Sequence, residues 1–362
     1  MTYQWPIDPA DLFAERHPQM VKTGLPPEDI ENVRSRVARM WADEPGGWVY
    51  EWSALGERYA DRREHERAVL AFGWARFPAI TDEHKRAAYR RQLEEYALAS
   101  PNFPVGFERR VVDLPHQDGV VPIALHILTP PGATADTPVI LTSGGADGWK
   151  TDLHDFFTQL ALKSALPVVV FDIPGTGETD VPITLESVEL VGQVIEYARG
   201  LGDGRVVHVG LSMGGFFSAA TGLSGLPDGA VVCGGPVEAT LAPGKHWAAG
   251  ANHIIGNTLG FTSVPEPAEL AKAMSALSLR PLLDRDDHVP MLAINGTEDV
   301  HIPLEDTLVF AGRRATEVVL LPDTGHCAVS KFDELEDRII DWINRTFAVR
   351  PAADRATAGA AG

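Results

Sequence analysis

The chain has 362 residues, of which 44% are hydrophobic and 22% are charged, a composition that suits one large folded domain or two. Its formal net charge of −19 argues against nucleic acid and anionic membranes as partners, because binding to phosphates needs clustered Lys and Arg. Neither cysteine, Cys233 or Cys327, has metal-ligand spacing, so we expect no disulfide framework and no metal site. We also expect no cofactor. We expect a cytoplasmic protein, because the N-terminus has neither a basic nor an apolar leader segment. We expect its partner to be a small-molecule substrate. The oligomeric state stays open, with a homodimer as one candidate.

Residues 1–104 predict a helical N-terminal domain. Apolar side chains recur there at helical spacing, and this predicts helices from Pro26 to about Trp41, over 48–59, over 67–77 and from Thr81 to about Ser100. We expect the Trp and Tyr side chains of these helices to form a core between helices, since amphipathic helices bury such faces.

Residues 105–348 predict an α/β domain with a mostly parallel, doubly wound sheet. The pattern begins with two strands, 107–114 and 121–128, around a turn at 116–119. Short apolar runs then alternate with helical segments, which is typical of parallel sheets. The strands are expected at residues 139–141, 168–171, 206–209, 230–233, 290–294 and 318–321. Residues 349–362, rich in Ala and Gly, predict a disordered tail.

One connection is too long for a simple strand–helix unit, whose loops usually have about 2–6 residues. Residues 236–288 therefore predict an inserted helical cap, on the side of the sheet where such folds bind ligands. A peripheral excursion away from the site is the alternative. Candidate substrate-lining residues in this insertion are His246, Trp247 and His253.

A G-x-S-x-G pattern from Gly210 to Gly214 follows an apolar run and precedes a helix-forming segment. This context indicates a nucleophile elbow, in which Ser212 occupies a strained turn and the two glycines avoid collisions. The alternative is a chance match in a Gly-rich α/β protein.

A serine nucleophile needs a histidine base and an orienting carboxylate, which follow it in the order Ser, acid, His in this kind of fold. His326 is the candidate base, because it comes just after the last predicted strand. Asp299 is the candidate acid, at the tip of a G-x-x-D turn after the preceding strand. Glu298 and Asp323 are its rivals, the first expected to face solvent and the second to shape its own turn.

Two backbone N–H groups are needed to stabilise an oxyanion. Met213 supplies the first candidate and Ala146 the second, with Gly145 as the alternative to Ala146. In the same Gly-rich loop, Asp147 and Lys150 are expected to form an ion pair. A D-x-P-G-x-G segment that begins at Asp172 is interpreted as a turn bordering the site, since it lacks the features of a phosphate-binding loop.

Taken together, these motifs resemble the α/β-hydrolase fold over about residues 105–348. In the N-terminal part, Tyr59-Ala60, Ala75–Pro78 and Ala87–Tyr89 resemble the FrsA-like hydrolases. That group includes 2,6-dihydroxypseudooxynicotine hydrolase and the fungal heptaketide chain-shortening hydrolase. The resemblance implies a helical domain and cap that close over the serine, and in several members hydrolysis of a C–C bond next to a ketone.

We therefore expect a serine hydrolase that cleaves a β-diketone, an acyl-aryl ketone or a polyketide-type compound, in catabolism or secondary metabolism. The first alternative is a carboxylesterase or thioesterase on a biosynthetic intermediate, or an acyltransferase or cyclase. The second is a non-catalytic regulatory binding protein on the same fold.

Overall fold

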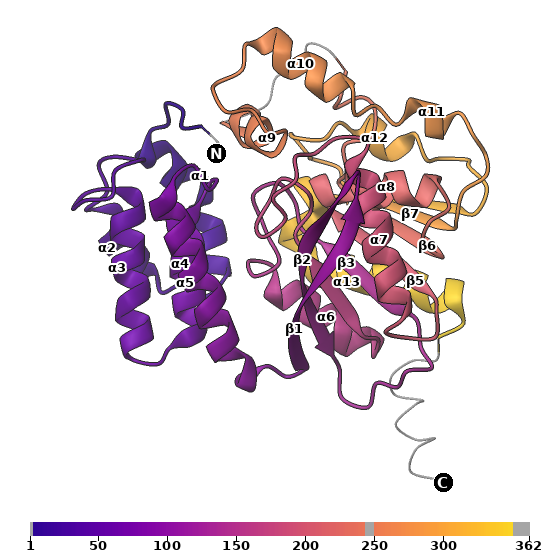
Figure 1. Ribbon diagram of the computed structural model, residues 1–362, viewed down its shortest axis with the longest axis horizontal. Coiled ribbons are helices and arrows are strands. Elements are labelled where there is room, and N and C mark those ends of the chain that lie inside the picture. The colour runs from indigo at the N-terminus through magenta and orange to yellow at the C-terminus, as the bar shows by residue number, and fades with distance from the viewer. Residues whose placement is uncertain (1–2, 243–249, 350–362) are drawn as a thin grey trace. The chain divides into compact units, whose positions relative to one another are not determined.

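The computed structural model describes residues 3–242 and 250–349, and it divides into two compact units (Figure 1). The first unit comprises Met1–Phe103 and Gly250–Pro265, and the second comprises Pro104–Ala249 and Glu266–Gly362. Part of the predicted cap insertion thus groups with the N-terminal helices. The predicted tail lies outside the described residues from residue 350 onward.

The first unit is helical. Its α-helices are α1 (Pro9–Lys22), α2 (Pro27–Arg34), α3 (Trp48–Asp61), α4 (His65–Arg76), α5 (Glu83–Ala99) and α9 (Ala251–Thr258). The sequence pattern missed α1, which begins after the capping side chain of Asp8 and contains Pro18. Helix α2 ends before Val37 and Trp41, so the predicted helix there was too long.

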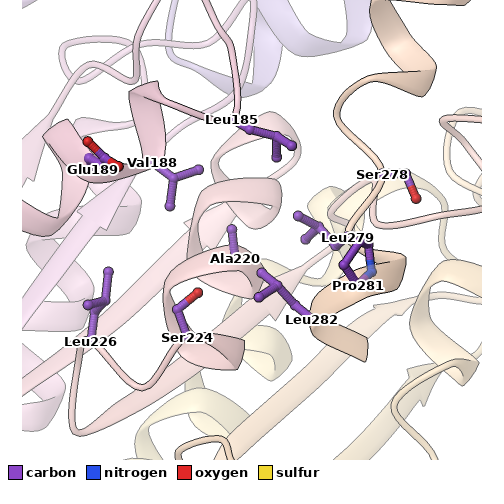
Figure 2. A pocket seen from close by; sticks show the side chains of 10 residues that line it. All are labelled: Leu185, Val188, Glu189, Ala220, Ser224, Leu226, Ser278, Leu279, Pro281 and Leu282. Atoms are coloured by element: carbon purple, nitrogen blue, oxygen red, sulfur yellow. The ribbon is translucent and has the colours of Figure 1, made fainter. Parts of the chain in front are cut away.

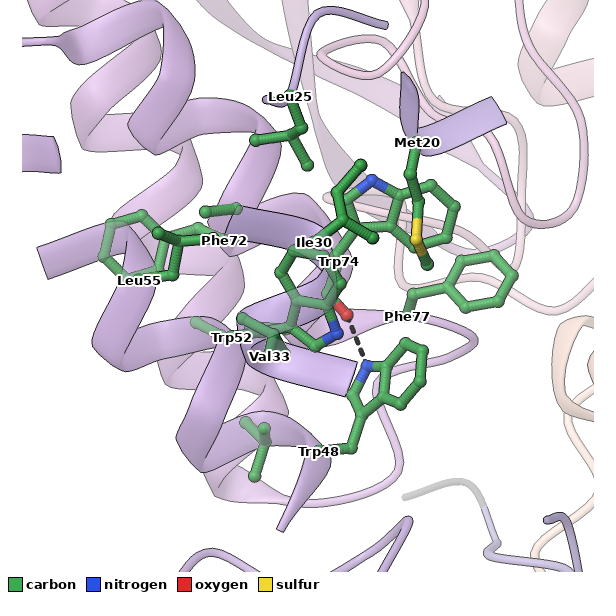
Figure 3. Packing of buried hydrophobic residues seen from close by; sticks show 14 of the residues in the cluster. Met20, Leu25, Ile30, Val33, Trp48, Trp52, Leu55, Phe72, Trp74 and Phe77 are labelled. Carbon is green, nitrogen blue, oxygen red and sulfur yellow. Dashed lines mark hydrogen bonds between the residues drawn. The ribbon is translucent and has the colours of Figure 1, made fainter. Parts of the chain in front are cut away.

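Aromatic side chains form much of the core of this unit, as predicted (Figure 3). Trp48 and Trp52 are completely buried, and Phe13 packs on both. The indole N–H of Trp48 donates to the carbonyl oxygen of Trp74 at 2.6 Å, which satisfies the one polar atom that this ring buries. The core is therefore apolar without leaving that donor unpaired.

The N-terminal segment before α1 packs on α9, although 254 residues separate Tyr3 from Asn257 in the sequence. The backbone N–H of Tyr3 donates to Oδ1 of Asn257 at 3.1 Å, and its hydroxyl donates to the carbonyl oxygen of His253 at 3.2 Å. The Trp5 ring stacks on the His253 ring with 5.2 Å between centroids. These contacts explain why residues 250–265 group with the first unit.

The second unit contains an eight-stranded sheet with the order β1-β2-β4-β3-β5-β6-β7-β8. The strands are β1 (Gly106–His116), β2 (Gly119–Thr129), β3 (Val139–Ser143), β4 (Val168–Phe171), β5 (Val206–Leu211), β6 (Gly229–Cys233), β7 (Met291–Gly296) and β8 (Thr316–Leu321). Strands β1, β2 and β4 pair antiparallel, and all other pairs are parallel. The predicted hairpin and the mostly parallel sheet are both confirmed.

Helices of this unit pack in pairs, α6 with α13 and α7 with α8. The α-helices are α6 (His154–Ser164), α7 (Ser187–Arg199), α8 (Met213–Leu223), α10 (Pro267–Ser275), α11 (Arg280–Leu283), α12 (Leu304–Leu308) and α13 (Phe332–Phe347). Strands β5, β7 and β8 are parallel, so the loops that follow them leave the same edge of the sheet. Ser212 and Asp299 lie in those loops, and His326 begins the short 3-10 helix η2 (His326–Lys331) that ends the loop after β8.

Within the described residues, no helix has the length and apolar character needed to cross a membrane.

Candidate active site

Ser212 lies in a sharp turn between β5 and α8. Its backbone has φ 55° and ψ −122°, a conformation that costs energy for any residue with a side chain. A Cβ atom on Gly210 would lie 2.0 Å from the carbonyl oxygen of Gly214, and one on Gly214 would lie 2.4 Å from that of Gly144. The turn therefore requires glycine at both positions, for the steric reason that the sequence pattern suggested.

The structure brings together the three side chains selected from the sequence. Nε2 of His326 lies 2.9 Å from Oγ of Ser212, and Nδ1 of His326 lies 2.7 Å from Oδ2 of Asp299. The two rivals for the acid position, Glu298 and Asp323, are exposed. The arrangement can carry a proton from the serine to the imidazole while the carboxylate stabilises the charged ring.

Asp299 is held by four donors. Its Oδ1 accepts the backbone N–H groups of His301 at 2.8 Å and Ile302 at 3.0 Å, and its Oδ2 accepts Nδ2 of Asn295 at 2.8 Å in addition to His326. Burial opposes the charge, but these hydrogen bonds and the imidazole outweigh it and lower the pKa of Asp299. The carboxyl group is therefore ionised at neutral pH and oriented towards the histidine.

His326 is followed by Cys327, whose Sγ lies 3.6 Å from Nε2 of His326. Burial raises the pKa of Cys327, so this thiol is uncharged at neutral pH. Burial also disfavours charge on the imidazole, but its interactions with Cys327 and with Asp299 together outweigh it and raise the pKa of His326 above its ordinary value. The charge that supports the histidine is thus that of Asp299.

The candidate oxyanion donors lie on either side of Ser212. Met213 is the first residue of α8, so its N–H has no partner four residues earlier in the same helix. The N–H of Gly145 donates to the carbonyl oxygen of Gly148 at 2.9 Å, which engages it inside its own loop. A Cβ on Gly145 would lie 3.0 Å from Oγ of Ser212, so this loop passes directly beside the serine. These contacts favour Ala146 over Gly145 as the second donor.

A buried ion pair fixes the Gly-rich loop to the D-x-P-G-x-G turn. The ammonium group of Lys150 contacts the carboxylate of Asp172 and lies 2.9 Å from Oε2 of Glu178, and the backbone N–H of Lys150 donates to Asp172 at 2.9 Å. The sequence had suggested Asp147 as the partner of Lys150. Burial disfavours ionisation of Asp172, but Lys150 outweighs it and lowers the pKa of Asp172. The carboxylate of the D-x-P-G-x-G motif therefore supports the loop.

The three candidate lining residues of the cap are not brought to Ser212 by any described contact. His246 and Trp247 lie outside the described residues. The His253 ring is packed between Tyr3 and Trp5 in the first unit, and burial lowers its pKa. His253 thus has a packing role in this structure.

One described pocket, of about 420 Å³, lies away from the serine (Figure 2). Mostly apolar side chains line it, from the start of α7 and the residues just before it, from α8 and the loop after it, and from α11 and the residues just before it. Ala220 is eight residues beyond Ser212, about 12 Å along α8 at the usual helical rise. This pocket is therefore distinct from the candidate active site.

Sequence reasoning missed Asn295 and the pairing of Asp172 with Lys150. Asn295 comes four residues before Asp299, but nothing in that spacing marks a contact with it. Among the described residues, no group of three or more His, Cys, Asp or Glu side chains is arranged to hold a metal ion.

Comparison with known proteins shows extensive similarity to hydrolases. The model of the Alpha/beta hydrolase family matches residues 131–338. The esterase FrsA from Vibrio parahaemolyticus is 25% identical over 338 residues, which cover 82% of this chain and 79% of that protein. Two solved structures share the fold over nearly their full length. AbyA5 has a TM-score of 0.76 at 22% identity, covering 92% of this chain and 94% of its own. The 2,6-dihydroxy-pseudo-oxynicotine hydrolase has a TM-score of 0.71 at 18% identity, covering 91% and 94%.

Proposed function

Because this chain belongs to the Alpha/beta hydrolase family and is a hydrolase, we propose that it works as a serine hydrolase with Ser212 as nucleophile, His326 as base and Asp299 as orienting acid. The observation that carries the proposal is the continuous hydrogen-bond chain from Oγ of Ser212 through both nitrogens of His326 to Asp299. A purely structural serine would need neither the strained turn nor an imidazole aligned with a buried carboxylate.

The proposed reaction begins with attack of Oγ of Ser212 on a carbonyl carbon, while Nε2 of His326 takes the hydroxyl proton. The N–H groups of Met213 and Ala146 stabilise the oxyanion that forms. Collapse of the tetrahedral intermediate breaks the bond to the leaving group, which takes the proton back from His326. Water, deprotonated by His326, then attacks the acyl-enzyme and releases the acid.

We propose a ketone as substrate, with the acyl group attached to an aryl ring or to the carbon of a second carbonyl system. In that case the bond cleaved is a C–C bond, and the leaving carbon keeps the electron pair as an enolate or a phenol-stabilised carbanion until His326 protonates it. Overall, one water is consumed and a carboxylic acid and a shorter ketone or phenol are released. The similarity to 2,6-dihydroxy-pseudo-oxynicotine hydrolase over 91% of this chain supports this class.

Ester hydrolysis is the second candidate, favoured by the similarity to proteins named esterase FrsA. The same residues would serve it, with an alkoxide as leaving group. The two candidates differ in the product, since only C–C cleavage transfers a proton to carbon. Mass spectrometry of the products separates the two, because a β-diketone yields a carboxylic acid and a shorter ketone, whereas an ester yields a carboxylic acid and an alcohol.

A fluorophosphonate probe tests the serine assignment without knowledge of the substrate. We expect the probe to label Ser212, and the Ser212→Ala variant to lose labelling and at least about 10⁴-fold in turnover on any substrate. A panel of aryl ketones, β-diketones, nitrophenyl esters and thioesters, with products identified by mass spectrometry, would then assign the class. Labelling that persists in the variant, or turnover within about tenfold of the parent, would exclude Ser212 as the nucleophile.

A further inference from the structure

Asn295 connects the two loops that carry the acid and the base. It lies near the carboxyl end of β7, and its side chain is completely buried. Nδ2 donates to Oδ2 of Asp299 at 2.8 Å, while Oδ1 accepts the backbone N–H groups of Gly296 at 2.9 Å and Cys327 at 3.1 Å. One amide therefore contacts the acid and the residue that follows the base.

The orientation of this amide is fixed by its partners. The N–H groups of Gly296 and Cys327 can only donate, so the atom that faces them must be the oxygen. The ionised carboxylate of Asp299 can only accept, so the atom that faces it must be the nitrogen. A flipped amide would lose all three hydrogen bonds at a fully buried position, where polar groups left unpaired are costly.

On the premise that Ser212, His326 and Asp299 perform the proposed reaction, we propose that Asn295 is a positioning residue with two roles. It holds the loop that carries His326 in place against the loop that carries Asp299. It also limits the basicity of His326, because it donates a hydrogen bond to the charged Oδ2 of Asp299. Asn295 does not touch the reacting atoms, and it acts through the carboxylate and through the backbone of Cys327.

The second role follows from a shared acceptor atom. Oδ2 of Asp299 accepts both Nδ1 of His326 and Nδ2 of Asn295. A donor on this oxygen stabilises the carboxylate charge and weakens its pull on the imidazole proton. Without Asn295 the imidazolium would be favoured up to a higher pH. A protonated His326 cannot accept the proton of Ser212, so the reactive form of the site would then appear only at higher pH.

Other groups around His326 leave Asp299 as its charged hydrogen-bond partner. The Cys327 thiol donates to the carbonyl oxygen of Cys233 at 3.4 Å and stays neutral because burial raises its pKa. The His301 ring meets the His326 ring edge-on, with centroids 5.4 Å apart. Glu298 and Asp323, on the two neighbouring loops, are exposed and therefore screened by solvent. A change in the charge on Asp299 should thus change the protonation equilibrium of His326 directly.

The test measures the rate of fluorophosphonate labelling of Ser212 between about pH 5 and 9 in the full-length protein. The acid limb of this profile reports the pKa of His326 and needs no known substrate. In Asn295→Leu, which has similar volume but no polar atoms, we expect the acid limb to move up by about one pH unit. We also expect the plateau rate to fall about 10- to 100-fold, since small displacements of catalytic groups have costs of that size.

Two further variants separate positioning from general destabilisation. Asn295→Asp keeps the acceptor for Cys327 and shares one proton with Asp299, because two carboxylates in contact cannot both ionise. It should therefore restore the acid limb to near that of the parent. Asn257→Leu is the matched control, since Asn257 is also a buried amide that is hydrogen-bonded at both ends but lies in the first unit. It should lower thermal stability without moving the acid limb.

An unmoved acid limb in folded Asn295→Leu would overturn the proposal, whatever the plateau rate. If that variant does not fold, Asn295→Ser, whose shorter side chain cannot span both loops, is expected to move the limb in the same direction, and an unmoved limb there overturns the proposal equally. Failure of the parent protein to label at Ser212 would refute the proposed function, and with it this inference. A parent that labels normally, beside variants with unmoved limbs, would refute the role of Asn295 alone.

Discussion

The two halves of the candidate site are positioned by different forces. Ser212 is held by backbone geometry, in a turn where glycines at 210 and 214 pass within contact distance of other backbone atoms. Asp299 and His326 are held by side-chain and backbone hydrogen bonds, several of which converge on Asn295 and on the Asp299 carboxylate. The position of Ser212 depends on the absence of side-chain atoms at Gly210 and Gly214. The positions of Asp299 and His326 depend on correctly placed hydrogen-bond donors.

This difference predicts how each half should fail. On the serine side, an added methyl group should displace the nucleophile while leaving charges unchanged. On the acid–base side, an exchange of isosteric polar groups should change charge and tautomer while leaving the volume unchanged. Of four experiments, ordered by decreasing expected effect, the first and the third test this contrast directly, and the second and the fourth test the scaffold around the site.

Asp299→Asn should have the largest effect. The change keeps the shape but favours the wrong tautomer of His326 and removes the charge that stabilises it, so turnover should fall about 10⁴-fold, or about 5.5 kcal/mol in transition-state energy. Glu298→Gln is the control, because Glu298 is the exposed neighbour, and it should change turnover by less than about twofold. Steady-state kinetics on any substrate that is turned over would measure both, and equal losses in the two variants would contradict the assignment of the acid.

Lys150→Met should lower the free energy of unfolding by about 3–5 kcal/mol, the usual cost of leaving a buried carboxylate without its partner. The side chains of Lys150 and Asp172 are both completely buried. Lys163→Met is the matched control, since Lys163 pairs with Glu336 and Asp337 but is partly exposed, and it should cost about 1 kcal/mol or less. Urea denaturation would measure both values. Similar losses would show that the buried pair of Lys150 and Asp172 contributes no more to stability than a partly exposed pair.

Gly214→Ala should reduce labelling of Ser212 about 100-fold, because the new Cβ would lie 2.4 Å from the carbonyl oxygen of Gly144 and must push the elbow away from it. Alanine is otherwise favoured over glycine inside a helix by about 1 kcal/mol, so helix propensity cannot explain a loss. Gly119→Ala is the control, where a Cβ meets only the carbonyl oxygen of His116 at 3.9 Å. Unchanged labelling of Gly214→Ala would show that backbone crowding does not position the serine.

The smallest expected effect concerns His208, buried in β5 below the elbow, where burial lowers its pKa to about 3. Because the folded protein disfavours the charged ring, the unfolded chain binds more protons below its ordinary pKa of 6.5. The contribution of neutral His208 to the free energy of unfolding is therefore present above about pH 6.5 and is lost as the pH falls towards 3. Between pH 6.5 and 5 this amounts to about 1.5 kcal/mol. Denaturant titrations at both pH values should show that His208→Leu loses less stability than the parent by this amount, and an equal loss in the two proteins would exclude a contribution from His208.

The serine side could be read largely from the sequence, whereas the acid–base side could be read only in part. Gly210 and Gly214 have a fixed spacing around Ser212, because the crowding that they relieve is local in the chain. Asn295 joins two loops that are 32 residues apart at Cys327, so no local pattern records the contact. The sequence already placed Ala146 ahead of Gly145 as the second oxyanion donor, and the hydrogen bond that engages Gly145 inside its own loop supports that order.

The helical unit shows the same limit on a larger scale. The cores of α3, α4 and α5 follow from helical periodicity. Helix α1 was missed because Pro18 lies inside it. The grouping of residues 250–265 with the N-terminal helices depends on Tyr3 and Trp5, about 250 residues away in the chain. Side chains so distant in sequence leave no periodic pattern for a reader of the sequence to follow.

That grouping has a consequence for recombination between related genes. A single crossover near residue 104 would join the N-terminal segment of one parent to α9 of another. Tyr3 would then meet a foreign partner in place of Asn257, and Trp5 one in place of His253. A domain exchange that keeps this packing intact must therefore transfer two separate pieces of the gene together. Chimaeras with crossovers near residues 104, 250 and 265 should express and fold more often than those with the single crossover near residue 104.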